Sequence, residues 1–108
     1  MKALKAAEFN EYVDRDGLIV LDFWANWCGP CKMLAPVMDA LEQRFPQVTF
    51  AKVNVDEEPE LAGAFRVDAI PCLFFVKDQQ VVSRMAGFQQ EDALAGAIEE
   101  LMKLWLFV

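Results

Sequence analysis

The feature of this sequence that most constrains its fold is the apolar run LIVLDFW at residues 18–24. Apolar residues follow one another here almost without interruption, whereas a strand with one wet face would alternate apolar and polar residues. The run therefore predicts a β-strand that is buried on both faces of a sheet. Its one charged residue, Asp22, is expensive to bury unless the carboxyl is paired or neutral.

Short helices and strands are predicted along the rest of the chain. Phe9, Tyr12 and Val13 stand at helical spacing within 7–14, and Asp16-Gly17 ends that segment. The further predicted elements are a helix at about 30–45 kinked by Pro36, a strand at 48–53, a short helix opened by Pro59, a hairpin of strands 72–76 and 81–85 around the turn DQQ, and a last helix at about 90–105. Strands that alternate with helices and end in a hairpin predict an α/β sandwich with a mixed sheet. A length of 108 residues predicts a single domain, 1–108.

The charged and apolar residues of the chain limit the partners and the cellular compartment that we expect for it. A formal net charge of -7 argues against a nucleic-acid partner, because phosphates attract clustered Lys and Arg. Charged residues interrupt the first seventeen positions, so we expect no signal peptide, and no apolar run reaches the roughly 18 residues that a membrane span needs. We therefore expect a cytoplasmic protein, in which a disulfide is more often transient and catalytic than structural.

Two of the three cysteines, Cys28 and Cys31, stand three positions apart in WCGPCK. A closed zinc site needs about four ligands, and three cysteines without a histidine do not supply them within one chain. A structural staple that closes about four residues would add only about 2 kcal/mol of stability. The third reading is a redox-active pair, and the position of the motif favours it, because the pair falls where the buried strand ends and a helix begins.

The residues of the motif also suit a reactive thiol. Cys28 at a helix N-terminus would meet free backbone N–H groups and the positive end of the helix dipole, which favour the thiolate. Pro30 starts the helix without wasting a backbone donor and stiffens the loop between the two sulfurs. Gly29 allows a substrate chain to approach closely.

The run DFWANWCGPCKMLAP at 22–36 resembles the active-site signature of the thioredoxin family, in its small bacterial type. The resemblance continues through AKVNVDEEP at 51–59, AIPCLFF at 69–75 and MAGF at 85–88, in the order that the family shows. It implies the thioredoxin fold, a central mixed β-sheet flanked by helices on both faces. It also implies a protein-disulfide reductase that keeps cytosolic protein thiols reduced and donates electrons to reductive enzymes.

The mechanism that the resemblance implies is thiol-disulfide exchange. Cys28 would attack a disulfide of a client protein, and Cys31, which we expect to be the more buried of the two, would release the reduced client. A thioredoxin reductase would then recharge the pair. The cycle needs no metal and no organic cofactor beyond the Cys28-Cys31 disulfide, and we expect the protein to work as a monomer.

Asp22 has two interpretations. It can be a satisfied polar residue at the strand edge, with a structural role alone. Alternatively, burial raises its pKa toward neutrality and makes it a base for the Cys31 thiol. The resemblance favours a base, because Asp22 matches the buried acid of the family and Lys52 matches the lysine near it, which together imply a proton relay beneath the disulfide.

The loop before the hairpin completes the implied site. From the residues alone, Pro71 would only start a strand, but it matches the cis-proline of the family, so we expect a cis Ile70–Pro71 bond. The resemblance implies that the backbone of Ile70 pairs with an extended client segment, and that Trp27, Ala69, Pro71 and Gly87 shape the groove. A turn glycine is the plain alternative at Gly87.

The chain departs from the family pattern in three places. Cys72 stands where a threonine is more usual, either as a small core residue or as a third thiol that could trap a mixed disulfide or join a shared metal cluster. The hairpin turn has Gln79-Gln80 where glycine would be easier. The apolar tail 106–108 either covers a groove of the same molecule or forms a patch for a partner, and Trp105 should continue the last helical stripe.

Two other functions remain open at this point. An oxidase or isomerase of the same fold would use the same cysteine pair, although Gly29-Pro30 favours a reductase, because a histidine between the cysteines would make the pair more oxidising. A non-catalytic interaction module would use the groove and the tail without turnover. Replacing Cys28 with Ser separates the module from the enzymes, because only the module would keep its function.

Overall fold

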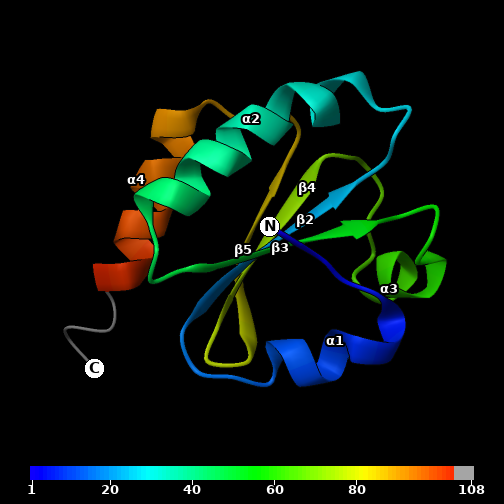
Figure 1. Ribbon diagram of the computed structural model, residues 1–108, viewed down its shortest axis with the longest axis horizontal. Helices are drawn as coiled ribbons and strands as arrows, with labels where there is room; N and C mark the ends of the chain where they lie inside the picture. Colours follow the sequence, from blue (N-terminus) through cyan, green and yellow to red (C-terminus); the bar gives the residue numbers. More distant parts are fainter. Residues whose placement is uncertain (104–108) are drawn as a thin grey trace.

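A five-stranded sheet forms the centre of the computed structural model, which describes residues 1–103 (Figure 1). The elements in chain order are β1 (Lys2–Ala3), α1 (Ala6–Val13), β2 (Leu18–Trp24), α2 (Gly29–Arg44), β3 (Thr49–Asn54), α3 (Pro59–Ala64), β4 (Cys72–Lys77), β5 (Gln80–Ala86) and α4 (Glu91–Lys103). The expectations for Trp105 and for the tail 106–108 lie outside the described residues.

The sheet is mixed, as the sequence predicts. Its strand order is β1-β3-β2-β4-β5, so the apolar run at Leu18–Trp24 forms the central strand. β2 pairs in parallel with β3 and antiparallel with β4, and β5 continues the antiparallel part as the second arm of the hairpin. In this register Asp22 stands between Lys52 on β3 and Leu73 on β4.

Helices cover both faces of the sheet, which explains why β2 is apolar at every position except Asp22. Figure 1 shows α2 and α4 on one side of the strands and α1 and α3 on the other. Because side chains alternate along a strand, Leu18 and Val20 pack under α2 and α4, whereas Leu21 and Phe23 point to the α1 and α3 side. Asp22 belongs by the same alternation to the α2 side.

The core on the α1 and α3 side is held by aromatic rings. Phe65 packs against Phe9, Phe23 and Phe74, with ring centroids 5.0 to 5.5 Å apart. The contacts of Phe65 with Phe9 and Phe74 are edge-to-face, and such pairs are worth about 0.5–1.5 kcal/mol each beyond the burial of the rings. This packing fixes α3 against the sheet beside the loop that leads to β4.

One local prediction, the position of the hairpin turn, needs correction. The hairpin turn is one residue earlier than expected: Lys77 pairs with Gln80, so the turn residues are Asp78 and Gln79. Both have positive φ, 49° and 73°, which is the backbone of a two-residue primed turn made here without glycine. The turn is fastened to Gly17, whose N–H donates to Asp78 Oδ1 and whose carbonyl accepts from the Asp78 N–H.

Pro36 lies inside α2 and does not end it. The helix runs from Gly29 to Arg44 through this position, close to the predicted bounds of about 30 and 45. Its apolar face, which includes Leu34 and Met38, is fully buried against the sheet. Tertiary packing therefore outweighs the backbone hydrogen bond that a proline removes.

Candidate active site

The two cysteines of the motif form a disulfide at the junction of β2 and α2. Their Cα atoms are 5.2 Å apart, within the range that a disulfide spans. Cys28 is the N-cap of α2, and its sulfur accepts a hydrogen bond of 3.2 Å from the Cys31 N–H. This amide and the positive end of the helix dipole would both stabilise a thiolate on Cys28 in the reduced protein.

The two cysteines are almost equally buried in the disulfide form, so the expectation that Cys31 is the more buried of the two is not confirmed by it. The exposed fractions of the two residues are 4% for Cys28 and 5% for Cys31. What separates them is the side of the site that each one contacts. The sulfur of Cys28 lies 3.7 Å from the Ile70 carbonyl oxygen, whereas Cys31 lines a cavity on the α2 side of the sheet.

Trp27, in the loop before the disulfide, is held by a residue that the sequence did not indicate. Its side chain is 70% exposed, and its Nε1–H donates a 2.8 Å hydrogen bond to Asp56 Oδ2. Asp56 is positioned in turn by Asn54, whose Oδ1 accepts from the backbone N–H groups of Asp56 and Glu57. No sequence pattern links Trp27 and Asp56, which are 29 positions apart.

The loop before β4 lies beside the disulfide. The Ile70–Pro71 bond is cis, as expected. Ala69 and Ile70 line a surface groove of about 410 Å³ together with Trp27. The groove thus brings together residues from the disulfide loop and from the loop before the hairpin.

Gly87 adjoins this loop through its backbone. Its N–H donates a 2.7 Å hydrogen bond to the Pro71 carbonyl, and its φ is +85°, a conformation that side chains rarely adopt. A Cβ atom built at this position would meet nothing within 4 Å. The conformation of the turn, rather than lack of space, therefore accounts for glycine here.

Asp22 lies beneath the disulfide on the α2 side of the sheet. The residue is 4% exposed, and its Oδ1 is buried without a hydrogen-bond partner, so the interpretation as a satisfied polar residue at a strand edge is wrong. Burial raises the pKa of Asp22 to about 7, and the positive charge of Lys52 opposes this rise. The ion pairs within 4 Å that the structure shows among residues 1–103 do not include one between Asp22 and Lys52.

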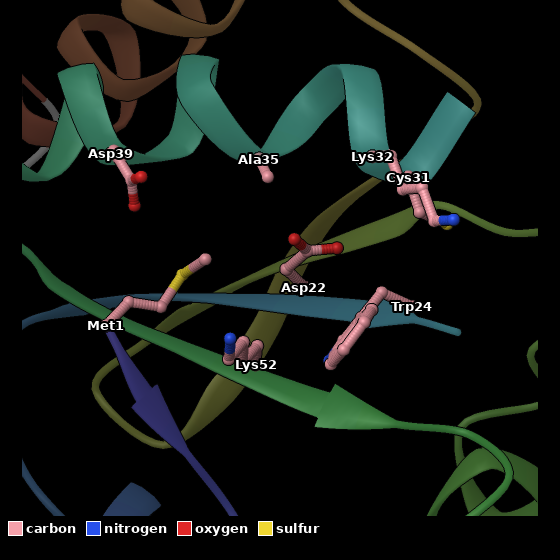
Figure 2. A pocket seen from close by; sticks show the side chains of 8 residues that line it. All are labelled: Met1, Asp22, Trp24, Cys31, Lys32, Ala35, Asp39 and Lys52. Atoms are coloured by element: carbon pink, nitrogen blue, oxygen red, sulfur yellow. The ribbon is translucent and has the colours of Figure 1, made fainter. Parts of the chain in front are cut away.

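A cavity of about 170 Å³ joins Asp22 to Cys31. Figure 2 shows Asp22 and Lys52 on the strands below and α2 above, with Cys31 at one end. The Lys52 ammonium lies 5.0 Å from the centroid of the Trp24 ring, which helps to hold it at the cavity. The space exceeds the roughly 10–15 Å³ that one water needs, so it can hold water between the carboxyl and the sulfur.

Cys72 is a free cysteine in the core. It is fully buried and belongs to the cluster on the α1 and α3 side, with Phe23, Ala51 and Val53. Asp22 lies on the opposite face of the sheet from Cys72. Burial raises the pKa of the Cys72 thiol. This packing supports the reading of Cys72 as a small core residue.

Within residues 1–103, no three His, Cys, Asp or Glu side chains are grouped so that they could hold a metal ion. None of the helices in that range is long and apolar enough to cross a membrane.

Comparison with known proteins agrees with this geometry. The sequence matches the family described as Thioredoxin over residues 1–100. The chain belongs to the thioredoxin family. The thioredoxin of Chlamydia caviae is 40% identical over 100 residues, which cover 93% of this chain and 97% of the relative. The thioredoxin of Bacillus subtilis is 45% identical over 80 residues, covering 73% and 77%.

Solved thioredoxin structures have the same fold. The structure of Fasciola hepatica thioredoxin superposes with a TM-score of 0.87 at 40% identity, covering 93% of this chain and 98% of the other. Mitochondrial thioredoxin 3 of Saccharomyces cerevisiae, in its oxidised form, gives a TM-score of 0.86 at 36% identity, covering 93% and 94%. Thioredoxins are thiol-disulfide oxidoreductases, and with its Cys28-Cys31 disulfide this chain is one of them.

Proposed function

We propose that the protein is a protein-disulfide reductase in which Cys28 is the nucleophile, Cys31 the resolving thiol and Asp22 the base. The observation that carries the proposal is the cavity that Cys31 lines together with Asp22, whose Oδ1 has no hydrogen-bond partner. Different groups therefore favour the thiolate of each cysteine. The N-terminus of α2 stabilises the thiolate of Cys28, and the Asp22 carboxyl accepts the proton of Cys31.

The first step is attack on a client disulfide. The Cys28 thiolate forms a bond to one client sulfur, and the other client sulfur leaves as a thiolate. The Cys31 N–H, which lies 3.2 Å from the Cys28 sulfur, stabilises the attacking thiolate. The product is a mixed disulfide between Cys28 and the client.

The second step releases the client. Asp22 takes the proton of the Cys31 thiol, directly or through water in the cavity, and the resulting thiolate attacks the Cys28 sulfur. The bond between Cys28 and the client breaks, and the second client sulfur leaves as a thiolate. The client gains two electrons, and the Cys28-Cys31 pair loses them. A pKa of about 7 suits Asp22 to this work, because a base acts best when its pKa lies near the operating pH.

The surface around Cys28 suits an extended, partly apolar client segment. Trp27, which lines the groove beside the disulfide, is 70% exposed, although large apolar side chains are usually buried. The Ile70 carbonyl beside the Cys28 sulfur can accept a hydrogen bond from a client backbone. Ala69, Pro71 and Gly87 complete this groove in our proposal.

The proposed partners are disulfide-containing client proteins and a thioredoxin reductase that returns electrons to the pair. We place the work of the protein in the cytoplasm, where it keeps protein thiols reduced and supplies reductive enzymes. Lys52 is assigned to the proton relay, because its charge opposes the rise in the pKa of Asp22. The protein acts as a monomer in this scheme.

Trapping with two matched variants tests the proposal. Cys31→Ser keeps the nucleophile and lacks the resolving thiol, so it should accumulate a mixed disulfide with insulin that a nonreducing gel separates. Cys28→Ser has the reverse defect and should trap little. The unchanged protein should reduce insulin with NADPH and a thioredoxin reductase. Equal trapping by both variants would contradict the assigned roles, and absence of insulin reduction would contradict the reductase.

A further inference from the structure

Met1 lines the cavity beneath Cys31, and the proposed chemistry does not account for it. Its side chain is only 6% exposed, although it stands at position 1 of the chain. Figure 2 shows its thioether entering the space between the sheet and α2, on the side of the cavity away from Cys31. Met1 also packs against the core cluster beneath α2 and α4.

Contacts on both sides of the cavity hold Met1 in place. Its amino group pairs with Glu42 Oε1 on α2 at 3.1 Å. The following residues pair with the opposite wall: Lys2 stands beside Ala51 in the parallel ladder of β1 and β3, and the Leu4 N–H donates a 2.8 Å hydrogen bond to the Lys52 carbonyl. The side chain of Met1 is therefore fixed between β3 and α2, where it limits the size of the cavity.

We propose that Met1 is a positioning residue of the redox site, whose side chain bounds the cavity on the β1 side and limits the amount of water that reaches the Asp22 carboxyl. The inference rests on the proposed function, because it concerns the base of that mechanism. Methionine suits the position, since its unbranched thioether fills irregular space without adding a strong hydrogen-bonding group. The Oδ1 of Asp22, which has no hydrogen-bond partner in the protein, makes the consequence specific, because additional water in an enlarged cavity would hydrate that atom.

Several charged or titratable groups share this environment, and they stay in place when only the Met1 side chain changes. They are Lys52 on β3, Cys31, Lys32 and Asp39 on α2, the Met1 amino group, and Cys72 on β4, which senses the charge of Asp22. A shift in the titration of Asp22 after truncation of Met1 therefore reports the entry of additional water. In the oxidised protein the two disulfide cysteines do not titrate, which simplifies the measurement.

The test is a titration of Asp22 in oxidised protein labelled with ¹³C-carboxyl aspartate, with Asp22→Asn identifying the signal. Met1→Ala is made from a gene with one additional start codon, whose methionine is removed because alanine follows it. That variant keeps an amino group opposite Glu42. We expect the pKa of Asp22 to fall by at least about one unit, toward its ordinary value, because hydration favours the charged carboxylate.

Met102→Ala is the matched control. Met102 is also a partly buried methionine against the core cluster of α2 and α4, but it does not line the cavity. We expect it to leave the pKa of Asp22 at the parent value. An unchanged pKa in Met1→Ala would overturn the inference, and so would an equal fall in both variants, because that would report general loosening of the core.

A second measurement decides the question if Met1→Ala does not fold. In the unchanged protein with ¹³C-methyl methionine, the Met1 methyl signal should move with pH at a midpoint of about 7 and should stop moving in Asp22→Asn. A Met1 signal that ignores the titration would overturn the inference. Neither measurement needs a client, so a protein that fails to reduce insulin would refute the proposed function without being mistaken for a failure of the Met1 inference.

Discussion

The free energy of unfolding of Asp22→Asn, taken relative to that of the unchanged chain, should be higher at alkaline pH than at acid pH. Asp22 is 4% exposed, and its pKa is raised from its ordinary value of 3.8 to about 7. The folded protein therefore keeps the proton over a pH range in which the unfolded chain releases it. Asn has nearly the same shape and does not ionise, so its stability does not depend on pH in this way.

The sign follows from proton binding. Below pH 3.8 the carboxyl is neutral in both states and Asp22 costs no ionisation energy. As the pH rises through 3.8, Asp22 ionises in the unfolded chain but not in the folded protein, so the free energy of unfolding falls. The fall is complete only above about pH 7, where Asp22 ionises in the folded protein as well. Because a tenfold change in an equilibrium is worth about 1.4 kcal/mol, the full loss is about 4 kcal/mol.

Urea unfolding of the oxidised proteins measures this effect. Between about pH 4.5 and about pH 8, the free energy of unfolding of Asp22→Asn relative to the unchanged protein should rise by about 3 kcal/mol. Comparing two pH values cancels the constant cost of burying the amide. Asp92→Asn, which removes a carboxylate whose side chain is 99% exposed, controls for the loss of one negative charge. A relative stability of Asp22→Asn that is flat across this range would refute the reasoning.

Three further substitutions test the packing and the site. Phe75→Ala, at a fully buried ring, should lower the free energy of unfolding by about 3–5 kcal/mol in urea, and a loss below about 1 kcal/mol would contradict the assigned core. Cys72→Ser should cost up to about 1–3 kcal/mol of stability, because a hydroxyl in this mostly apolar cluster has, among residues 1–103, only the Arg84 side chain as a polar neighbour, while insulin reduction continues at the parent rate once the protein is folded. Loss of reduction would make Cys72 part of the chemistry. Trp27→Phe should raise KM for insulin several-fold with a small change in kcat, because it removes the 2.8 Å hydrogen bond to Asp56 that orients the ring at the groove. Steady-state kinetics would instead show a lower kcat with a small change in KM if the ring acted in the chemical step.

Local patterns in the sequence predicted most of the fold. The continuous apolar run of β2 indicated a strand covered on both faces, and the cysteine motif stands at the N-terminus of α2 as expected. The short strand β1 could not be predicted, because Lys2 and Ala3 show no periodicity and form a strand only by pairing with β3. The turn at Asp78-Gln79 was missed because neither residue is the glycine that usually marks positive φ.

The candidate site, too, was predicted only where a single local pattern marked a residue. The sequence indicated Asp22 because a carboxyl inside an apolar run is costly to bury. In the structure Asp22 is buried as expected, and this burial raises its pKa. The contact between Asp56 and Trp27 and the position of Met1 in the cavity were not predicted. Both depend on segments that are distant in the sequence and meet only in the folded chain, so no local spacing records them.

The measurement that tests the central claim most directly is the reduction potential of the Cys28-Cys31 pair, determined against glutathione buffers with Cys72→Ser in parallel. A dithiol that donates electrons to clients should have a potential below the range of about -220 to -260 mV at which cytosolic glutathione is poised by extraction methods, and both samples should agree. A potential at or above about -180 mV would contradict the reductase and indicate an oxidase or isomerase.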